Sequence, residues 1–570
     1  MRDSNHRYFL MKFIRPHILT MAILIALSFV STLFSFITPL LTKSLVDDVF
    51  IDGRTTLFGY IILGTAGTYL VSSFSTYISN YKKGELDLIL FNDVAMEAFN
   101  AIQFASMKIT QEMKVGDLLS RIVVNTRSAI SMFTIIIPEF VVNAIRIITP
   151  FIIMLFLNFR LTLIVMIPAL LILFPAMFFG KRLEFTQKAS LEKTASIYSF
   201  LKENLSMIPL IKVFGLEMWS RNKFNEQMKG YYDASLEYTK NSSLNNSVGS
   251  LMYGVPMVLL IFFGGPMVIQ GSLTIGTFTA FMSYVILFFN PIAQFAFLWS
   301  YYKSSSPAFD RVNEIFRLEQ DNGGKEKLIV NDGIVEFDDV CFSHNNRRIL
   351  HGFNATFIKG LNYIVGDNGT GKSTILKLLC SLYPLEKGCI KIDGQDISEV
   401  RRADLRKNIS MIFSEPYLFD GSIYENILIG NLSASKEEII KAAKLVKVHE
   451  FVTSLSKGYE TQVGESGLKL SSGEKQKIAL ARAILKNSPI ILLDEVTKSI
   501  DIESRESIND VIKSLKNNKT IIIITHNIND IEQGSNMIYL VQENQRKGSI
   551  PHSIDLPISK SVLSRKVQGL

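Results

Sequence analysis

The 570-residue chain has few cysteines, and their arrangement excludes several kinds of site. There are three, Cys341, Cys380 and Cys389, all in the C-terminal part of the sequence. They lack metal-ligand spacing and an accompanying group of histidines, so the sequence does not predict a zinc site. We expect buried, reduced thiols, as is usual for a cytosolic domain.

Charged residues are also scarce, at 20% of the chain, whereas ordinary soluble domains contain about 25%. The mean hydropathy is +0.24. The apolar surplus lies before about residue 310, and the sequence after about residue 325 is typical of a soluble α/β protein. The net charge is +8, but the Lys and Arg residues do not form one basic stripe, which argues against a nucleic-acid-binding protein.

No cleavable signal peptide is evident, because the first apolar stretch is too long for one and others follow it. A helix needs about 20 apolar residues to cross a bilayer, and six segments with few charges meet this length. They are residues 17–41, 57–79, 133–157, 161–180, 248–269 and 275–299. The sequence therefore predicts an all-α membrane domain of six transmembrane helices.

The connections between these six segments differ in length and charge. On one side they are short, whereas residues 80–132 and 181–247 on the other side are long and rich in Lys and Arg. Cytoplasmic loops collect such residues. We therefore expect a multi-pass protein of the cell membrane whose termini and C-terminal domain are cytoplasmic. The long connections show helical spacing, so the membrane helices should continue into the cytoplasm.

Three polar residues interrupt the third apolar segment. Glu139, Asn143 and Arg146 have the spacing i, i+4 and i+7, which puts them on one helix face. They could line a substrate cavity, in which case Glu139 would weakly favour a cationic or peptide substrate. Alternatively, Arg146 compensates Glu139 internally.

The C-terminal part contains a phosphate-binding pattern, G-x-x-x-x-G-K-[ST]. It lies between a strand signal at residues 361–365 and a helical signal at 375–382, the context that the motif requires. Backbone N–H groups and a helix N-terminus can bind phosphate there, Lys372 should reach the β and γ phosphates, and Ser373 should bind Mg²⁺. The predicted ATP-binding residues are Gly366, Asp367, Asn368, Gly369, Thr370, Gly371, Lys372, Ser373 and Thr374.

A second pattern is an apolar strand run, residues 490–493, that ends in two carboxylates. A carboxylate at this position can hold the Mg²⁺ shell, which suits Asp494. Glu495 is placed to polarise a water molecule for attack on the γ phosphorus.

Residues 470–474, Leu-Ser-Ser-Gly-Glu, resemble the signature sequence of ATP-binding cassette (ABC) proteins, whose usual form is L-S-G-G-Q. The resemblance covers essentially the whole chain. Other segments that resemble the family in order and spacing are residues 214–217 (coupling segment), 340–344 (adenine-stacking aromatic), 461–467 (loop before the signature), 499–501 (D-loop) and 524–526 (switch histidine). The chain is identified as an exporter half-transporter of this family.

This resemblance implies a six-helix membrane domain followed by an α/β P-loop nucleotide-binding domain with a helical subdomain. It also implies two cassettes that sandwich two ATP molecules head to tail, with Ser471 and Gly473 contacting the partner's nucleotide. His526 would be catalytic beside Glu495, His344 would stack on adenine, and Asp501 would belong to the D-loop. The expected partner is a second copy of the chain or a related half-transporter.

Four positions in three segments depart from the family pattern. Ser414 stands where the family has the Q-loop glutamine, Ser472 and Glu474 alter the signature, and His344 replaces a tyrosine. Glu495 and His526 are both present, so we expect hydrolysis to continue with altered coupling or a slower rate.

The leading hypothesis is ATP-driven export of an amphipathic or hydrophobic peptide, lipid or drug by alternating access. An importer, a heterodimeric partner subunit with reduced coupling, and an ATP-gated regulatory module are the alternatives. No N-terminal Cys/His peptidase domain is present, so cleavage of a leader peptide is not expected. The expected domains are 1–318 (membrane), 319–332 (linker), 333–545 (cassette) and 546–570 (polar tail).

Overall fold

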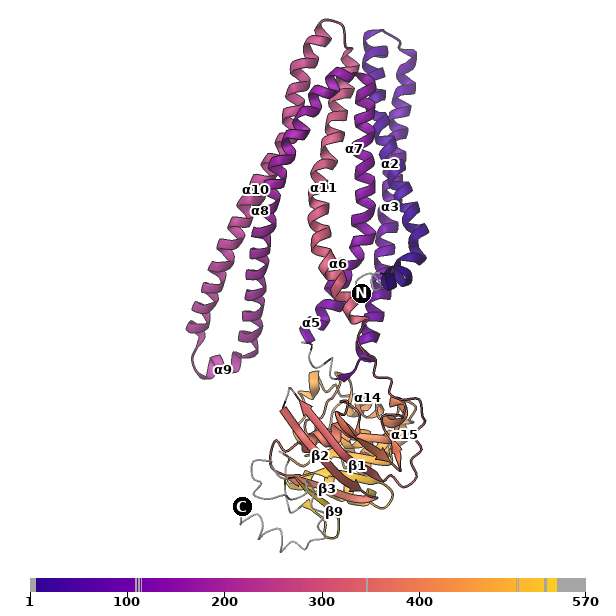
Figure 1. Cartoon of the computed structure of the whole chain (residues 1–570), viewed down its shortest axis with the longest axis vertical. Coiled ribbons are helices and arrows are strands. Elements are labelled where there is room, and N and C mark those ends of the chain that lie inside the picture. The colour runs from indigo at the N-terminus through magenta and orange to yellow at the C-terminus, as the bar shows by residue number, and fades with distance from the viewer. Residues whose placement is uncertain are drawn as a thin grey trace. The chain divides into compact units, whose positions relative to one another are not determined.

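The computed structural model describes residues 7–107, 110, 113, 115–344, 347–498, 500, 502–526 and 530–540 (Figure 1). The chain packs as two units, Met1–Ile102 with Lys114–Arg317, and Gln103–Met113 with Leu318–Leu570. The second unit thus includes a short segment, Gln103–Met113, that the sequence analysis had assigned to the membrane domain. The expected polar tail, 546–570, lies outside the described residues.

The described part of the first unit consists of helices and short connections. Its long helices are α2 (Ile18–Ser44), α3 (Thr56–Gln103), α7 (Ile137–Leu157), α8 (Phe159–Ser206), α10 (Glu217–Ile269) and α11 (Ile275–Ile315). Shorter elements are η1 (Leu10–Ile14), η2 (Arg15–His17), η3 (Leu45–Ile51), α5 (Val115–Leu119), η4 (Ser120–Asn125), α6 (Thr126–Ser131), η5 (Met132–Ile136) and α9 (Ile208–Val213). Helices α3, α8 and α10 contain 48, 48 and 53 residues, more than twice the length that crosses a bilayer. These three helices therefore extend well past their apolar segments, and their continuation into the cytoplasm stays a prediction.

Four segments of the described chain are long and apolar enough to span a membrane: 7–51, 56–103, 115–157 and 275–292. The other two expected spans, 161–180 and 248–269, lie in α8 and α10. There, side chains 168–181 and most of 246–253 are outside the described part, and Gly254–Ile269 is a shorter apolar stretch. The helical membrane domain is confirmed, and the count of six stays a prediction.

The helices of the first unit pack in two ways. Helices α8 and α10 run side by side and are joined at their tip by α9 (Figure 1). Helix α11 packs against α2 and α7, and a buried cluster that includes Phe36, Met154 and Tyr284 fills this contact. The Tyr284 hydroxyl donates a hydrogen bond to the Phe36 carbonyl oxygen at 2.6 Å, so its polar end is satisfied.

The second unit contains two sheets. One has the antiparallel order β2-β1-β4-β5, from β1 (Val335–His344), β2 (Arg347–Phe357), β4 (Lys387–Ile392) and β5 (Gln395–Asp396). The other has the parallel order β6-β7-β8-β3-β9, from β3 (Gly360–Gly366), β6 (Ile409–Ile412), β7 (Ile490–Asp494), β8 (Thr520–Ile524) and β9 (Asn536–Leu540). Strands β7 and β8 are fully buried, which explains their continuous apolar runs.

The α-helices in the described part of the second unit are α12 (Lys372–Leu379), α13 (Arg402–Asn408), α14 (Ile423–Leu428), α15 (Lys436–Leu445), α16 (His449–Ser454), α17 (Ser472–Lys486) and α18 (Ile502–Leu515). Helices α14, α15 and α17 pack on one another and form a helical subdomain. The predicted α/β fold with a helical subdomain is confirmed.

The linker is attached to the second unit by specific contacts. The Asp321 carboxylate accepts a hydrogen bond from Arg402 Nε at 2.9 Å and pairs with Arg406. The main chain also bonds to the short segment of the same unit, because Asp321 N donates to the Phe104 carbonyl oxygen at 2.8 Å. The polar composition of the linker therefore reflects ion pairing as well as exposure.

The three cysteines are free thiols, as expected, but only Cys341 is fully buried. Cys389 is half-buried, so the expectation of burial was wrong for this residue, whereas Cys380 is half-buried as a residue but its thiol is enclosed. Desolvation raises the pKa of the Cys380 thiol to about 12, which keeps this group protonated at neutral pH.

Candidate nucleotide site

The predicted nucleotide-binding segments meet at one edge of the parallel sheet. Strand β3 pairs with β8, β8 with β7, and β7 with β6, all in parallel, so their carboxyl ends lie together. In particular, Ile524 is opposite both Ile364 and Asp494. The phosphate loop, Ser414, Glu495 and His526 each follow one of these strands. This is the edge at which open α/β sheets bind ligands.

The phosphate loop joins the end of β3 to α12, which begins at Lys372. Gly369 and Gly371 have φ values of +81° and +92°, in the left-handed region that favours glycine. A Cβ atom at Gly371 would lie 2.7 Å from Ile349 Cγ2, so glycine is also required by space. The loop can therefore turn backbone N–H groups toward an anion at the start of α12.

Lys372 lies folded into this loop. Its ammonium donates hydrogen bonds to the carbonyl oxygens of Gly366 at 2.8 Å and Asp367 at 2.6 Å, and its side chain is buried. Burial lowers the pKa of Lys372, although the nearby charges of Glu495 and Asp367 oppose this. The ammonium is thus held at the point where the pattern predicts phosphate.

Ser373 and Asp494 form the candidate Mg²⁺ ligands. The Ser373 hydroxyl donates to Asp494 Oδ1 at 2.9 Å, and burial raises the pKa of Asp494. Hydroxyl and carboxylate oxygens suit Mg²⁺, which usually takes one or two protein ligands and fills its shell with phosphate and water oxygens. Among the described residues no group of three or more His, Cys, Asp or Glu could hold a metal ion. The residues present therefore fit an ion held mainly by a triphosphate.

Glu495 is held firmly at the end of β7. Its φ is +49°, its N–H donates to the Ile524 carbonyl oxygen at 3.1 Å, and its Oε1 lies 2.5 Å from His526 Nε2. Its Oε2 accepts a hydrogen bond from Lys498 Nζ at 2.7 Å. Partial burial raises the pKa of Glu495, but the bond from Lys498 and the charge of His526 outweigh burial and lower it overall. The carboxylate is therefore ionised at neutral pH.

Ser414 is joined to the signature helix through its main chain. Its carbonyl oxygen accepts a hydrogen bond from Gln476 Nε2 at 2.8 Å, and Gln476 is buried in α17. Sequence analysis did not single out Gln476, because nothing in its spacing indicates a contact with the loop after β6, 62 residues earlier. The link between Ser414 and α17 thus does not need the missing glutamine side chain.

The signature segment forms the start of α17. Ser471 is the N-cap, its hydroxyl accepts from Glu474 N at 3.3 Å, and Glu474 Oε2 accepts from Ser471 N at 2.8 Å. This reciprocal arrangement is a capping box. Glu474, which departs from the family pattern, therefore has a local structural role, while Gly473 is buried behind it.

Two family models match the chain, one described as ABC transporter transmembrane region at residues 21–292 and one described as ABC transporter at residues 350–498. The chain belongs to the ABC transporter family. It is an ATPase coupled to transport across a membrane, and a multi-pass membrane protein.

Individual relatives match almost the full length of the transporter. YgaD of Bacillus subtilis, named as a candidate multidrug export ATP-binding/permease protein, is 29% identical, over 93% of this chain and 93% of its own. An ATP-dependent lipid A-core flippase of Syntrophus aciditrophicus is 26% identical, over 94% and 89%. The structure of a bacterial Atm1-family ABC exporter with ATP bound has a TM-score of 0.79 at 24% identity, covering 92% of this chain and 94% of that one. This last likeness supports the fold.

Two other sequence-predicted residues have different outcomes in the transporter. His344 ends β1, and its ring centroid lies 6.0 Å from that of Tyr383 in an edge contact. Tyr383 is a second aromatic group near the expected adenine position, which sequence analysis missed because it is distant in the chain. Asp501 of the expected D-loop lies outside the described residues.

The polar stripe of α7 has a partner from another helix. Glu139 Oε1 accepts a hydrogen bond from Lys83 Nζ of α3 at 3.0 Å, and Arg146 lies 3.9 Å from Glu139 Oε2. Arg146 also donates to Asn143 Oδ1 at 3.3 Å. Two cations thus face one carboxylate, which removes the basis for expecting a cationic substrate. Sequence analysis missed Lys83, because a partner on another helix has no fixed spacing.

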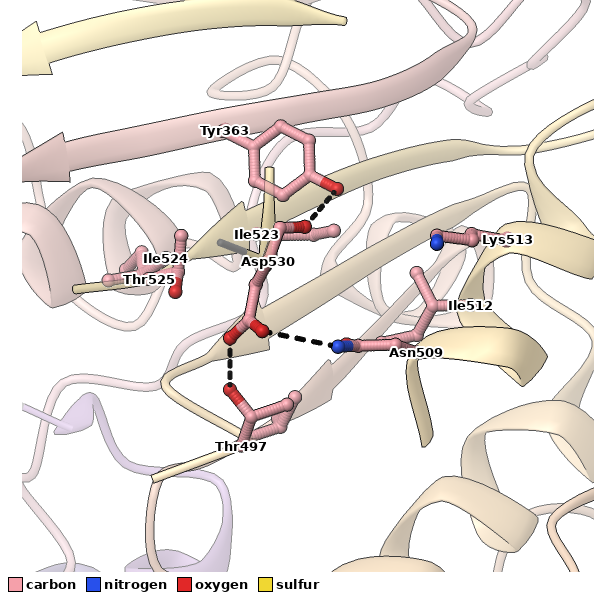
Figure 2. Close-up of a pocket in the computed structure, with 10 residues that line it drawn as sticks. Tyr363, Thr497, Asn509, Ile512, Lys513, Ile523, Ile524, Thr525 and Asp530 are labelled. Atoms are coloured by element: carbon pink, nitrogen blue, oxygen red, sulfur yellow. Dashed lines mark hydrogen bonds between the residues drawn. The ribbon is translucent and has the colours of Figure 1, made fainter. Parts of the chain in front are cut away.

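A small cavity is lined in part by Val496 and Thr497, the two residues that follow Glu495 (Figure 2). It has room for little more than one water molecule, about 10 Å³, so it is no substrate site. In it, Asp530 accepts hydrogen bonds from Thr497 Oγ1 at 3.2 Å and Asn509 Nδ2 at 3.3 Å, and its carbonyl oxygen accepts from the Tyr363 hydroxyl at 3.2 Å. Asp530 therefore ties the segment after Glu495 to α18 and β3.

Replacing Asp530 with alanine should destabilise the nucleotide-binding unit by about 1–3 kcal/mol. The partly buried donors Thr497 Oγ1 and Asn509 Nδ2 would lose their hydrogen-bond acceptor. A shift of about 2–6 °C in the thermal unfolding midpoint is expected for a unit of this size. Asp510→Ala is the matched control, since Asp510 is exposed and reaches Lys447 only at 3.9 Å. Equal midpoints for the two variants would contradict the bracing role.

Proposed function

We propose that this transporter exports an amphipathic or hydrophobic substrate, powered by ATP hydrolysis at two composite sites of a homodimer. The observation that carries the proposal is the contact of Glu495 with His526 at the sheet edge where Ser373 meets Asp494. Glu495, the proposed base, belongs to the same chain as the long apolar helices, so hydrolysis and transport can be coupled within one protein.

Each residue at the sheet edge takes a role in hydrolysis. Lys372 exchanges the carbonyl oxygens of its own loop for the β and γ phosphates. Ser373 and Asp494 would hold Mg²⁺, which would neutralise charge on the phosphates. Glu495 accepts the proton of the attacking water, and His526 holds the carboxylate in place through Oε1.

The second chain completes each site. Ser471 and Gly473 of one chain contact the nucleotide bound to the phosphate loop of the other, so a single copy has two half-sites. Asp501 belongs to the loop that meets the partner. A related half-transporter is the alternative partner, and the departures at Ser414 and Ser472 favour testing it.

The relatives' names suggest the substrate class. Multidrug export and flipping of a lipid both move molecules with large apolar parts, which suits a lipid or drug better than a peptide. The transporter would lie in the cytoplasmic membrane, with both termini and the cassette in the cytoplasm. The termini and the cassette are on the same side of the predicted spans as the Lys- and Arg-rich connections, and cytoplasmic loops are enriched in these residues. The candidates for the substrate path remain Glu139, Asn143 and Arg146. The proposed domains remain the membrane domain (1–318), the linker (319–332), the cassette (333–545) and the polar tail (546–570).

Transport by the purified chain alone tests this function. Reconstituted into vesicles with the cassette outside, it should accumulate an apolar fluorescent dye or lipid analogue when MgATP is added, and the substrate should stimulate ATPase activity. Efflux in this orientation would indicate an importer. Turnover only after addition of a related chain would indicate a heterodimer, and ATP binding without turnover or transport would indicate a regulatory module.

A further inference from the structure

Lys498 contacts the proposed base but has no part in the mechanism above. Its ammonium donates to Glu495 Oε2 at 2.7 Å, while His526 lies 2.5 Å from the other oxygen, Oε1. Both carboxylate oxygens are thus engaged by groups that stabilise negative charge.

The contact between Lys498 and Glu495 is local. Lys498 follows Glu495 by three residues, and its N–H donates to the Glu495 carbonyl oxygen at 3.0 Å in the turn after β7. It therefore forms within one turn of the second unit and needs neither a second chain nor the membrane helices.

The two partners differ in freedom of movement. The Glu495 side chain is 13% exposed and its backbone is fixed by the bond to Ile524, whereas the Lys498 side chain is 60% exposed. A long lysine side chain in water can leave such a pair readily. The ammonium is therefore the part that moves.

An ammonium on Oε2 opposes the chemistry expected of Glu495. Each carboxylate oxygen can accept more than one hydrogen bond, so a water molecule can still approach. However, the ammonium lies at Oε2, the oxygen that His526 does not contact, so the water must compete with it for a hydrogen bond to this oxygen.

We propose that Lys498 is a positioning residue that acts as a latch on Glu495, pairing with its carboxylate and slowing proton abstraction until the ammonium moves away. The inference rests on the proposed role of Glu495 as the base. Exposed ion pairs are weak, so the latch slows turnover by about two- to fivefold and does not block it.

Steady-state ATPase kinetics of the full-length protein in lipid vesicles test the latch. Lys498→Met keeps the length of the side chain and removes the charge, so kcat should rise about two- to fivefold with an unchanged KM for ATP. Lys498→Arg keeps the cation and should remain near the wild-type kcat. Lys441→Met, an exposed lysine on α15, is the matched control and should change neither constant.

Other results would overturn the latch. A lower kcat in Lys498→Met would mean that the ammonium assists the base, and a raised KM with unchanged kcat would assign it to nucleotide binding. If Lys498→Arg behaved like Lys498→Met, shape and not charge would matter. In the Glu495→Gln background, Lys498→Met should not raise the residual turnover. If Glu495→Gln by itself kept full turnover, the proposed base would fail independently of Lys498.

Discussion

Replacing Glu495 with glutamine is expected to lower ATP turnover by about 10²–10⁴-fold while nucleotide binding persists. The amide has the size of the carboxylate but cannot accept the proton of the attacking water. Glu495 is well placed for this role, since φ is +49° and the Ile524 carbonyl oxygen holds its N–H at 3.1 Å. Phosphate release, measured beside equilibrium binding of labelled ATP, separates the two effects.

A matched control for this variant is Glu450→Gln, which changes an exposed carboxylate on α16 of the same unit. It should leave turnover within twofold of the wild type, because surface substitutions away from the site have small effects. If Glu495→Gln retained wild-type turnover, another residue would have to be the base. If it lost ATP binding as well, Glu495 would hold the site together and would not act on water.

Replacing Lys372 with alanine is expected to weaken ATP binding by about 100-fold or more and to abolish transport. Hydrogen bonds to a charged partner contribute about 1.5–3 kcal/mol each, and the ammonium can make two of them to phosphate oxygens. The buried position of Lys372 at the N-terminus of α12 directs the charge into the loop. Titration with a fluorescent ATP analogue measures the affinity, and dye accumulation in vesicles measures transport.

The Lys372 variant also loses the bonds to the carbonyl oxygens of Gly366 and Asp367, so its folding must be measured. Lys372→Arg retains a cation that can bind these oxygens and should keep the thermal midpoint. Lys359→Ala, an exposed lysine before β3, should leave ATP affinity unchanged. Full transport by a folded Lys372→Ala protein would rule out the phosphate loop as the energy source.

Several features could be predicted because they depend on neighbouring residues in the chain. The loop from Gly366 to Ser373 is one continuous segment, and the apolar runs of β7 and β8 indicate buried parallel strands by composition. The long helices follow from unbroken helical spacing. Lys498 also lies within reach of sequence reasoning, since it is three residues after Glu495, but its significance depends on which way the turn directs its side chain.

Other features could not be predicted, because they join distant parts of the chain. Lys83 pairs with Glu139 from another helix, and Gln476 holds the carbonyl oxygen of Ser414 from α17. Asp530 bonds to Thr497 and Asn509, which lie 33 and 21 residues earlier in the chain. Each of these contacts depends on how helices, strands and loops pack together. The residue periodicity of one element does not indicate which other element packs against it.

Short segments with characteristic spacing were enough to establish the family, the order of the membrane and nucleotide-binding parts, and the residues of the phosphate loop. The contacts of Glu495 with His526 and of Glu139 with Lys83 depend on the fold, because these residues are distant in the chain. The reason is that a carboxylate is stabilised in its ionised form by cations that lie within about 4 Å of it. The fold can supply such a cation from any position in the chain.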